Sequence, residues 1–177
     1  MDRLPHTQIR VGSVCLVPFA KHIPRGKKVS AMEVVNKLNP NDEQLQGFLD
    51  PEAKGPICMV NLLKFRDKAE YADGRETSLT GAEAYALYSK GVVACLEKVG
   101  GYLGFGGQVN RLMLGEVEEM WDTIALAVYP SRQAMLQMMQ LPEYQAIHVH
   151  RDAGLAGQLN IETVDFQGSW LTQGGSE

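Results

Sequence analysis

The apolar run PICMVNLLKF at residues 56–65 constrains the fold more than any other feature of the chain. A strand with one buried face alternates apolar and polar residues, whereas a strand covered on both faces is apolar throughout. Both alternations of this run are apolar. We therefore predict a central strand here, in a sheet whose two faces are both covered.

The residues after this run predict helices and strands in a regular order. Thr80 and Glu83 form a capping box, which begins a helix that ends before Gly100. Apolar residues recur at helical spacing along it, at Tyr85, Tyr88, Val92, Leu96 and Val99. Further patterns predict strands and helical segments, the two helical segments being separated by Pro142: strands at 102–114, 121–129 and 159–166, helical segments at 130–140 and 143–155.

The resulting order is strand, helix, strand, strand, helix, strand. This is the βαββαβ arrangement of ferredoxin-like α+β domains, which have a four-stranded antiparallel sheet with helices on one face. We predict that residues 56–167 form such a domain and that residues 168–177 form a C-terminal tail.

Residues 1–55 differ from the rest of the chain because their strand and helix signals are short and interrupted by Pro and Gly. Two helix caps are recognisable, one at Ser30 and one at Asn41 or Asp42. These residues are therefore predicted to form an N-terminal arm with short helices packed on the main domain.

The helices of this arrangement cover only one face of the sheet. The predicted strands at 56–65 and 121–129 are nevertheless apolar on both alternations. An uncovered apolar sheet face needs a partner. Pairing of two sheets in a homodimer, as in the dimeric α/β barrels, is the simplest solution, and the N-terminal arm is the alternative cover.

Composition and charge exclude several partners and locations. The net charge is −4, and Lys and Arg form no basic face with interleaved aromatics, so nucleic acid is not expected as a partner. The apolar segment at 11–20 is too short to span a bilayer and lacks a cleavage site, so neither membrane insertion nor export is expected. Cys15, Cys58 and Cys95 contain no C-x-x-C pair and fit free thiols in a reducing compartment, which predicts a cytoplasmic location.

No residue pattern predicts a cofactor or a metal ion. His148 and His150 are two residues apart, which directs them to different sides of a helix, and no thiolate cluster accompanies them. The glycine-rich residues 100–107 lack the G-x-G-x-x-G order of a dinucleotide site. We therefore expect neither a cofactor nor a metal.

The last predicted helix holds the strongest group of candidate site residues. Tyr144, His148 and Arg151 are spaced four and three residues apart, which places them on one helix face. An imidazole, a fixed cation and a phenol on one face could bind a carboxylate or enolate and move a proton. The alternative is that His148 and Arg151 bond to Glu143, Asp152 or strand-end carbonyls.

Other polar residues interrupt apolar patterns. Asn61 lies on the strand face shared with Met59 and Leu63, either as a satisfied core amide or as a ligand contact. Tyr85 and Tyr88 lie on the helix stripe that faces the sheet, either as plain core or as polar groups of an apolar pocket.

Four sequence blocks together resemble the domain of unknown function 1330 family: MVNLLKFR, TGAEAYALY, WDTIALAVYPSRQAML and PEYQAIHVHRDAGL. The resemblance covers residues 56 to about 165. It implies a dimeric α/β-barrel fold and supplies no reaction. Related barrels include cofactor-free monooxygenases, muconolactone isomerase, polyketide cyclases, haem-dependent chlorite dismutases and proteins without known catalysis, so the fold does not select an activity.

Three hypotheses for function follow. The first is a homodimer whose cavity binds a small, largely apolar acid or ketone. If it is catalytic, we expect cofactor-free proton transfer, with His148 as acid or base and Arg151 holding an anion. The second is a non-catalytic binding or structural homodimer, and the third a cofactor-free monooxygenase that relies on Trp121 and the tyrosines.

Arg151 carries the most specific expectation. Its helix face packs towards the sheet, and a buried guanidinium needs a carboxylate or an anionic ligand because desolvating a charge costs several kcal/mol. The strands offer carboxylates only near their ends, at Glu83 and Glu118. We therefore predict that Arg151 binds an anionic ligand in a solvent-reachable pocket.

Overall fold

The computed structural model describes residues 33–50 and 52–168, which form four strands and four helices. In chain order these are α1 (Asp42–Phe48), β1 (Ile57–Phe65), α2 (Gly81–Lys98), β2 (Tyr102–Gln108), β3 (Thr123–Tyr129), α3 (Arg132–Gln140), α4 (Pro142–Gly154) and β4 (Leu155–Thr163). The strands form one antiparallel sheet in the order β2-β3-β1-β4. This is the ferredoxin-like α+β arrangement, and the predicted fold class is confirmed.

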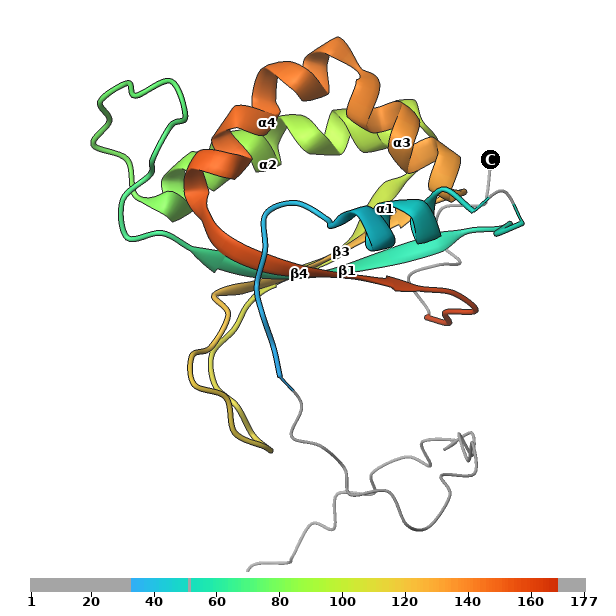
Figure 1. Ribbon diagram of the computed structural model, residues 1–177, viewed down its shortest axis with the longest axis horizontal. Coiled ribbons are helices and arrows are strands. Elements are labelled where there is room, and N and C mark those ends of the chain that lie inside the picture. Colours follow the sequence, from blue (N-terminus) through green and yellow to red (C-terminus); the bar gives the residue numbers. More distant parts are fainter. Residues whose placement is uncertain (1–32, 51, 169–177) are drawn as a thin grey trace, which may run out of the picture. The chain divides into compact units, whose positions relative to one another are not determined.

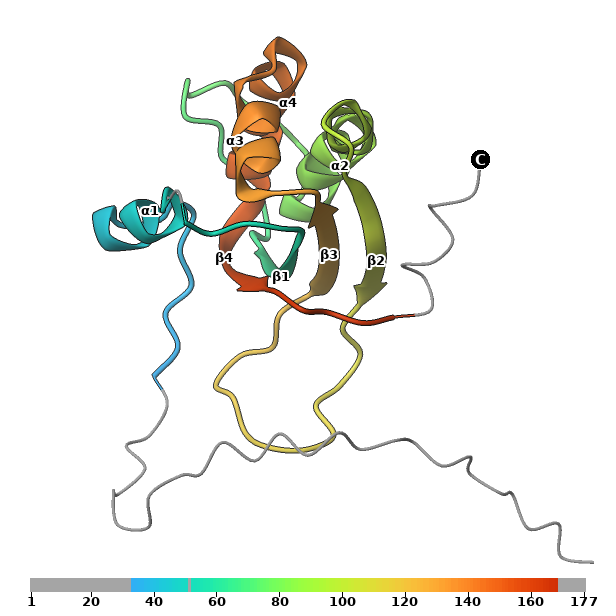
Figure 2. The ribbon, with the colours of Figure 1, turned by 90° about the vertical axis from the view of Figure 1, so that its right-hand side faces the viewer.

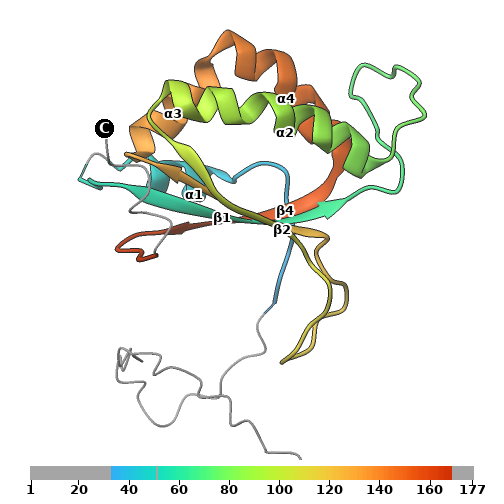
Figure 3. The ribbon, with the colours of Figure 1, turned by 180° about the vertical axis from the view of Figure 1, so that it is seen from behind.

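The helices α2, α3 and α4 lie over one face of the sheet (Figure 1). The view from behind shows the same layering, with the β2–β3 connection extending from the opposite face (Figure 3). In the described part of the chain no helix covers that opposite face. The helix α1 lies beside the β4 edge (Figure 2). No described helix is both long and apolar enough to cross a membrane.

The register of β1 and β3 separates the two faces of the sheet. Asn61 pairs with Ala125, and Met59 with Ala127, on the face that the helices cover. Met59 belongs to the main hydrophobic core, together with side chains of α2, α3 and α4. The alternate residues of β1, including Val60 and Leu62, therefore point away from the helices.

Several strand boundaries differ from the sequence prediction. β2 ends at Gln108 and β3 begins at Thr123, so the residues between them form a connection rather than strand ends. β4 begins at Leu155, four residues earlier than predicted, and therefore includes Gly157. Within the strand Gly157 pairs with Lys64. A glycine suits this position because Asn36 packs against it: a Cβ at Gly157 would lie 2.7 Å from Asn36 Cβ.

The described part of the predicted N-terminal arm contains one of its two predicted helices. α1 begins after the predicted cap, Asn41, whose side chain accepts a hydrogen bond from Gln44 N. The helix predicted from Ser30 is not formed over residues 33–38, because Lys37 instead exchanges two 3.0 Å backbone hydrogen bonds with Gln158 on β4. Residues 1–32, including Ser30 and Cys15, Pro51 and the tail residues 169–177 lie outside the described part.

A close backbone contact joins α2 and α4 at one end of the sheet. A Cβ at Gly81 would overlap the carbonyl oxygens of Arg66 and Gly154, and a Cβ at Gly154 would lie 2.9 Å from Tyr85 N. Backbone hydrogen bonds fix this junction, from Arg66 N to Gly154 O at 2.9 Å and from Gly81 N to Arg66 O at 3.0 Å. Glycine is required at both positions because there is no room for a side chain.

We predict that Gly154→Ala lowers the free energy of unfolding by about 3 kcal/mol, because the added methyl group meets backbone atoms that cannot move away. Gly47→Ala is the matched control, since a Cβ there has nothing within 4 Å. Urea unfolding of both variants measures the difference. Equal stability of Gly154→Ala and wild type would contradict the close contact.

Candidate functional site

A cavity of about 1210 Å³ lies between the helix-covered face of the sheet, the helices α2, α3 and α4, and the segment around α1. Apolar side chains from every one of these elements line it, among them Leu38, Phe48, Met59, Leu63, Val92, Leu96, Met135 and Met138. Six of the seven predicted site residues also line it: Asn61, Tyr85, Tyr88, Tyr144, His148 and Arg151. The remaining one, Trp121, does not.

A row of aromatic rings runs from Phe65 on β1 to His148 on α4, and every member except Phe65 lines the cavity. The ring centroids of Phe65 and Tyr85 are 5.2 Å apart, and those of Tyr85 and Tyr88 are 5.3 Å apart. The row continues from Tyr88 to Tyr144 at 6.1 Å and from Tyr144 to His148 at 6.2 Å. Such contacts stabilise aromatic pairs by more than the burial of their apolar area alone. The side chains of the row therefore hold one another in place and form an aromatic wall.

Three tyrosines that line the cavity, Tyr85, Tyr88 and Tyr129, have raised pKa values. Burial raises the pKa of Tyr85 to about 12, although the nearby charge of Arg151 partly offsets this rise. Burial also raises the pKa of Tyr88 well above its ordinary value, and the pKa of Tyr129 is raised for the same reason. The cavity therefore presents neutral hydroxyl groups.

Asn61 is bonded within the sheet, as in the first of the two roles that the sequence left open. Its side-chain amide donates to Met59 O at 3.1 Å and to Ala125 O at 3.2 Å, which ties β1 to β3. Both amide hydrogens are thereby used. Its Oδ1 accepts no hydrogen bond from the described residues and remains an acceptor in the cavity wall.

The face of α4 predicted from residue spacing does point into the cavity, through Tyr144, His148 and Arg151. His148 Nδ1 lies 3.0 Å from Gln145 O, within the same helix. His148 Nε2 lies 3.8 Å from Asp152 Oδ2. His150 lies away from this group, as expected, and its Nδ1 is 2.7 Å from the hydroxyl group of Tyr71.

Arg151 has a carboxylate partner in its own helix, which is one of the two alternatives that the sequence left open. Its guanidinium forms an ion pair with the adjacent Asp152 and also donates to Leu38 O at 3.1 Å. Glu83 is not involved, because its carboxylate accepts from Thr80 N in the cap of α2. The expectation of an anionic ligand considered only Glu83 and Glu118 and did not count Asp152 as a partner: neighbours in a helix do not face each other, but a flexible guanidinium spans the gap.

A second ion pair, which the sequence did not predict, also lines the cavity. Arg132 Nε lies 2.9 and 3.1 Å from the two carboxylate oxygens of Glu162, and both side chains are about four-fifths buried. Arg132 also donates to Gly47 O at 3.0 Å and lies over the ring of Phe48. No local spacing signals this pair, because the start of α3 and the end of β4 meet only in the folded sheet.

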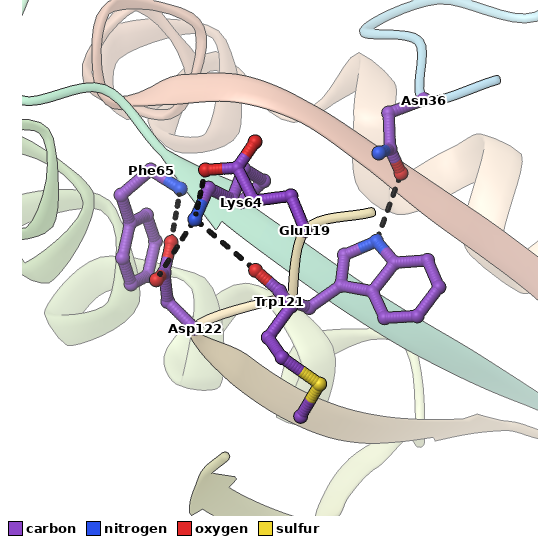
Figure 4. Close-up of polar contacts among 7 residues, drawn as sticks. Asn36, Lys64, Phe65, Glu119, Trp121 and Asp122 are labelled. Carbon is purple, nitrogen blue, oxygen red and sulfur yellow. Dashed lines mark hydrogen bonds and ion pairs between the residues drawn. The ribbon is translucent and has the colours of Figure 1, made fainter. Parts of the chain in front are cut away.

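Trp121 lies outside the cavity, before the first residue of β3 (Figure 4). Its Nε1 donates to Asn36 Oδ1 at 2.8 Å. The neighbouring amine of Lys64 lies 2.8 Å from a carboxylate oxygen of Glu119 and also contacts Asp122. The indole therefore holds the N-terminal segment and the β2–β3 connection together and does not reach a cavity ligand.

Among residues 33–50 and 52–168, no group of three or more His, Cys, Asp and Glu side chains is arranged to hold a metal ion. The two cysteines in this part, Cys58 and Cys95, are buried and free. Burial raises the pKa of both thiols, which makes them poor nucleophiles.

The chain is similar to two crystal structures of one protein. RPA0582 from Rhodopseudomonas palustris, a protein of unknown function, is 31% identical, with a TM-score of 0.67 over 76% of this chain and 100% of that chain. The chain belongs to the RPA0582 family. The methylated form of RPA0582 gives 34% identity and a TM-score of 0.68 over 77% of this chain and 99% of that one. The RPA0582 family therefore shares the fold described above.

Other similarities are weaker. SnoaB from Streptomyces nogalater, a cofactor-independent oxygenase, is 12% identical with a TM-score of 0.39 over 65% of this chain and 97% of that chain. This similarity is too low to bear on the function of the RPA0582 family. No protein-family profile and no curated protein matches the chain.

We predict that Tyr85→Phe makes stability less sensitive to alkaline pH. Above pH 10 the unfolded chain loses the phenolic proton while folded Tyr85, with its pKa of about 12, keeps it. The free energy of unfolding therefore falls by about 1.4 kcal/mol per pH unit for this group across that window. Urea unfolding from pH 9 to 12 should show a shallower decline in Tyr85→Phe than in wild type; parallel curves would mean that Tyr85 ionises freely.

Proposed function

We propose that the protein is a homodimer whose cavity binds a small organic molecule. The observation that carries this proposal is the cavity itself, which is mostly apolar, has an aromatic wall and contains a few placed polar groups. Ligand sites in proteins have this composition. Its volume, about 1210 Å³, is sufficient for a molecule with fused rings.

The dimer is supported by the sheet face that no described helix covers. Val60 and Leu62 of β1 are in register with Leu126 and Ile124 of β3 on that face, and Phe105 of β2, which pairs with Leu126, is 51% exposed. A contiguous apolar surface of this kind marks an interaction site. A second copy of the chain fits it, because two identical apolar sheet faces are complementary without any charged partner.

Proton transfer is the chemistry that the cavity would support. His148 has its Nε2 free of any backbone partner in the described structure and could act as acid or base. The hydroxyl groups of Tyr85 and Tyr88 could donate to a carbonyl oxygen and stabilise the negative charge that develops on it. In this proposal Arg151 positions Asp152, which lies beside His148, rather than holding an anion itself.

Non-catalytic binding is the second candidate. It is favoured by the observation that His148 and Arg151 both bond to neighbours within α4 and to a backbone carbonyl, as the structural alternative expected. The hypothesis of a cofactor-free monooxygenase relied on Trp121 and the tyrosines; the predicted site tyrosines line the cavity, whereas Trp121 does not.

We also propose that the chain belongs to the domain of unknown function 1330 family within the dimeric α/β barrels. The four sequence blocks support this membership. The free thiols of Cys58 and Cys95 support a cytoplasmic location.

Ligand binding is tested with the uncharged fluorescent probe N-phenyl-1-naphthylamine. Wild type should bind it with enhanced fluorescence, and Ala125→Trp should weaken binding by at least about tenfold because the indole fills the cavity beside Asn61. Ala72→Trp is the control, since this residue is exposed on a loop. Equal binding by both variants would place the probe elsewhere.

The dimer is tested by Phe105→Lys, which puts a charge on the uncovered sheet face and should give a monomer. Leu87→Lys on α2 is the matched control, because Leu87 has a comparable exposure of 40% and lies on a helix. Light scattering after size exclusion measures both masses. A wild-type mass of 19.5 kDa, that of one chain, would refute the homodimer.

A further inference from the structure

The charged groups that line the cavity cancel one another. Arg132 is paired with Glu162, and Arg151 with Asp152. Lys37 also lines the cavity, but it is exposed at the N-terminal segment, where water solvates its charge. Both guanidinium groups inside the cavity, those of Arg132 and Arg151, therefore have a carboxylate partner among the described residues.

The cavity also contains uncharged polar groups, among them two tyrosine hydroxyl groups and the amide of Asn61. The hydroxyl groups of Tyr85 and Tyr88 are protonated because burial raises their pKa values. The hydroxyl group of Tyr85 makes no hydrogen bond with another described residue, and Asn61 Oδ1 accepts none. Tyr85 thus offers the cavity a free hydroxyl donor, and Asn61 offers it a free amide acceptor.

We infer that the ligand is an uncharged ring compound that carries a carbonyl or hydroxyl oxygen, and that carboxylates are excluded. The inference rests on the proposed function of the cavity. An anion would lose its hydration, meet no unpaired guanidinium and lie near the carboxylates of Glu162 and Asp152. A neutral ring loses little on leaving water and stacks on the row from Tyr85 to His148.

This inference reverses the expectation that Arg151 recruits an anion. The expectation depended on a guanidinium without an acid partner, and Asp152 supplies that partner. Of the acid and the ketone considered from the sequence, the ketone is the class that fits.

Two probes of nearly identical shape test the inference: naphthalene-2-carboxamide, which is neutral, and 2-naphthoate, which is ionised at pH 7. Calorimetric titration of the wild-type protein should give a dissociation constant at least about tenfold lower for the amide. Comparable or tighter binding of the naphthoate would overturn the inference and leave the binding function standing. Binding of neither compound would count against both.

A charge variant provides the second arm of the test. Glu162→Gln removes the acid partner of Arg132, so the affinity for the naphthoate relative to that for the amide should rise by about tenfold or more. Asp152→Asn does the same for Arg151 and serves if the first variant does not fold. Glu119→Gln is the control, because Glu119 pairs with Lys64 outside the cavity. No relative gain of naphthoate binding in either folded variant would overturn the inference.

Discussion

The contact between Gly81 and Gly154 is the constraint on which the rest of the structure depends. It brings the start of α2, the end of α4 and the end of β1 together through backbone atoms alone. Because β4 begins at the residue after Gly154, the same contact fixes the register of that edge strand. The helices are thereby held at a set height above the sheet, which leaves room for tyrosines on α2 and α4 to line a cavity.

Local signals in the sequence were sufficient for most of the fold. The cap at Thr80 with Glu83 and the cap at Asn41 occur where the residues predict them, because capping uses only neighbouring backbone groups. The start of β4 and the extended segment at 33–38 were missed. Both depend on the edge of β4 pairing with Lys37, a contact between residues more than a hundred positions apart.

The candidate site, like the fold, was predictable where it depends on neighbouring residues and not where it depends on contacts between distant ones. Helical spacing places Tyr144, His148 and Arg151 on one face, and that face does line the cavity. The charge balance was not predictable, since it depends on the Arg132–Glu162 pair, which joins a helix to a strand. Residue spacing within one helix or strand predicts which way its side chains point. The charge of the ligand that a site accepts depends on ionic partners from other helices and strands.

The two arginines that balance the charge also hold the N-terminal segment in place. Arg151 donates to Leu38 O, and Arg132 donates to Gly47 O. From Leu38 to Phe48 the segment buries little side-chain surface: these two residues are half-buried, and those between them are exposed. Releasing it breaks a few hydrogen bonds and leaves the sheet and the tyrosine row intact, so it is among the least costly local openings of the fold. If a ligand exchanges by this route, the step that admits it is the breaking of the hydrogen bonds from Arg151 to Leu38 O and from Arg132 to Gly47 O. Such exchange does not require global unfolding.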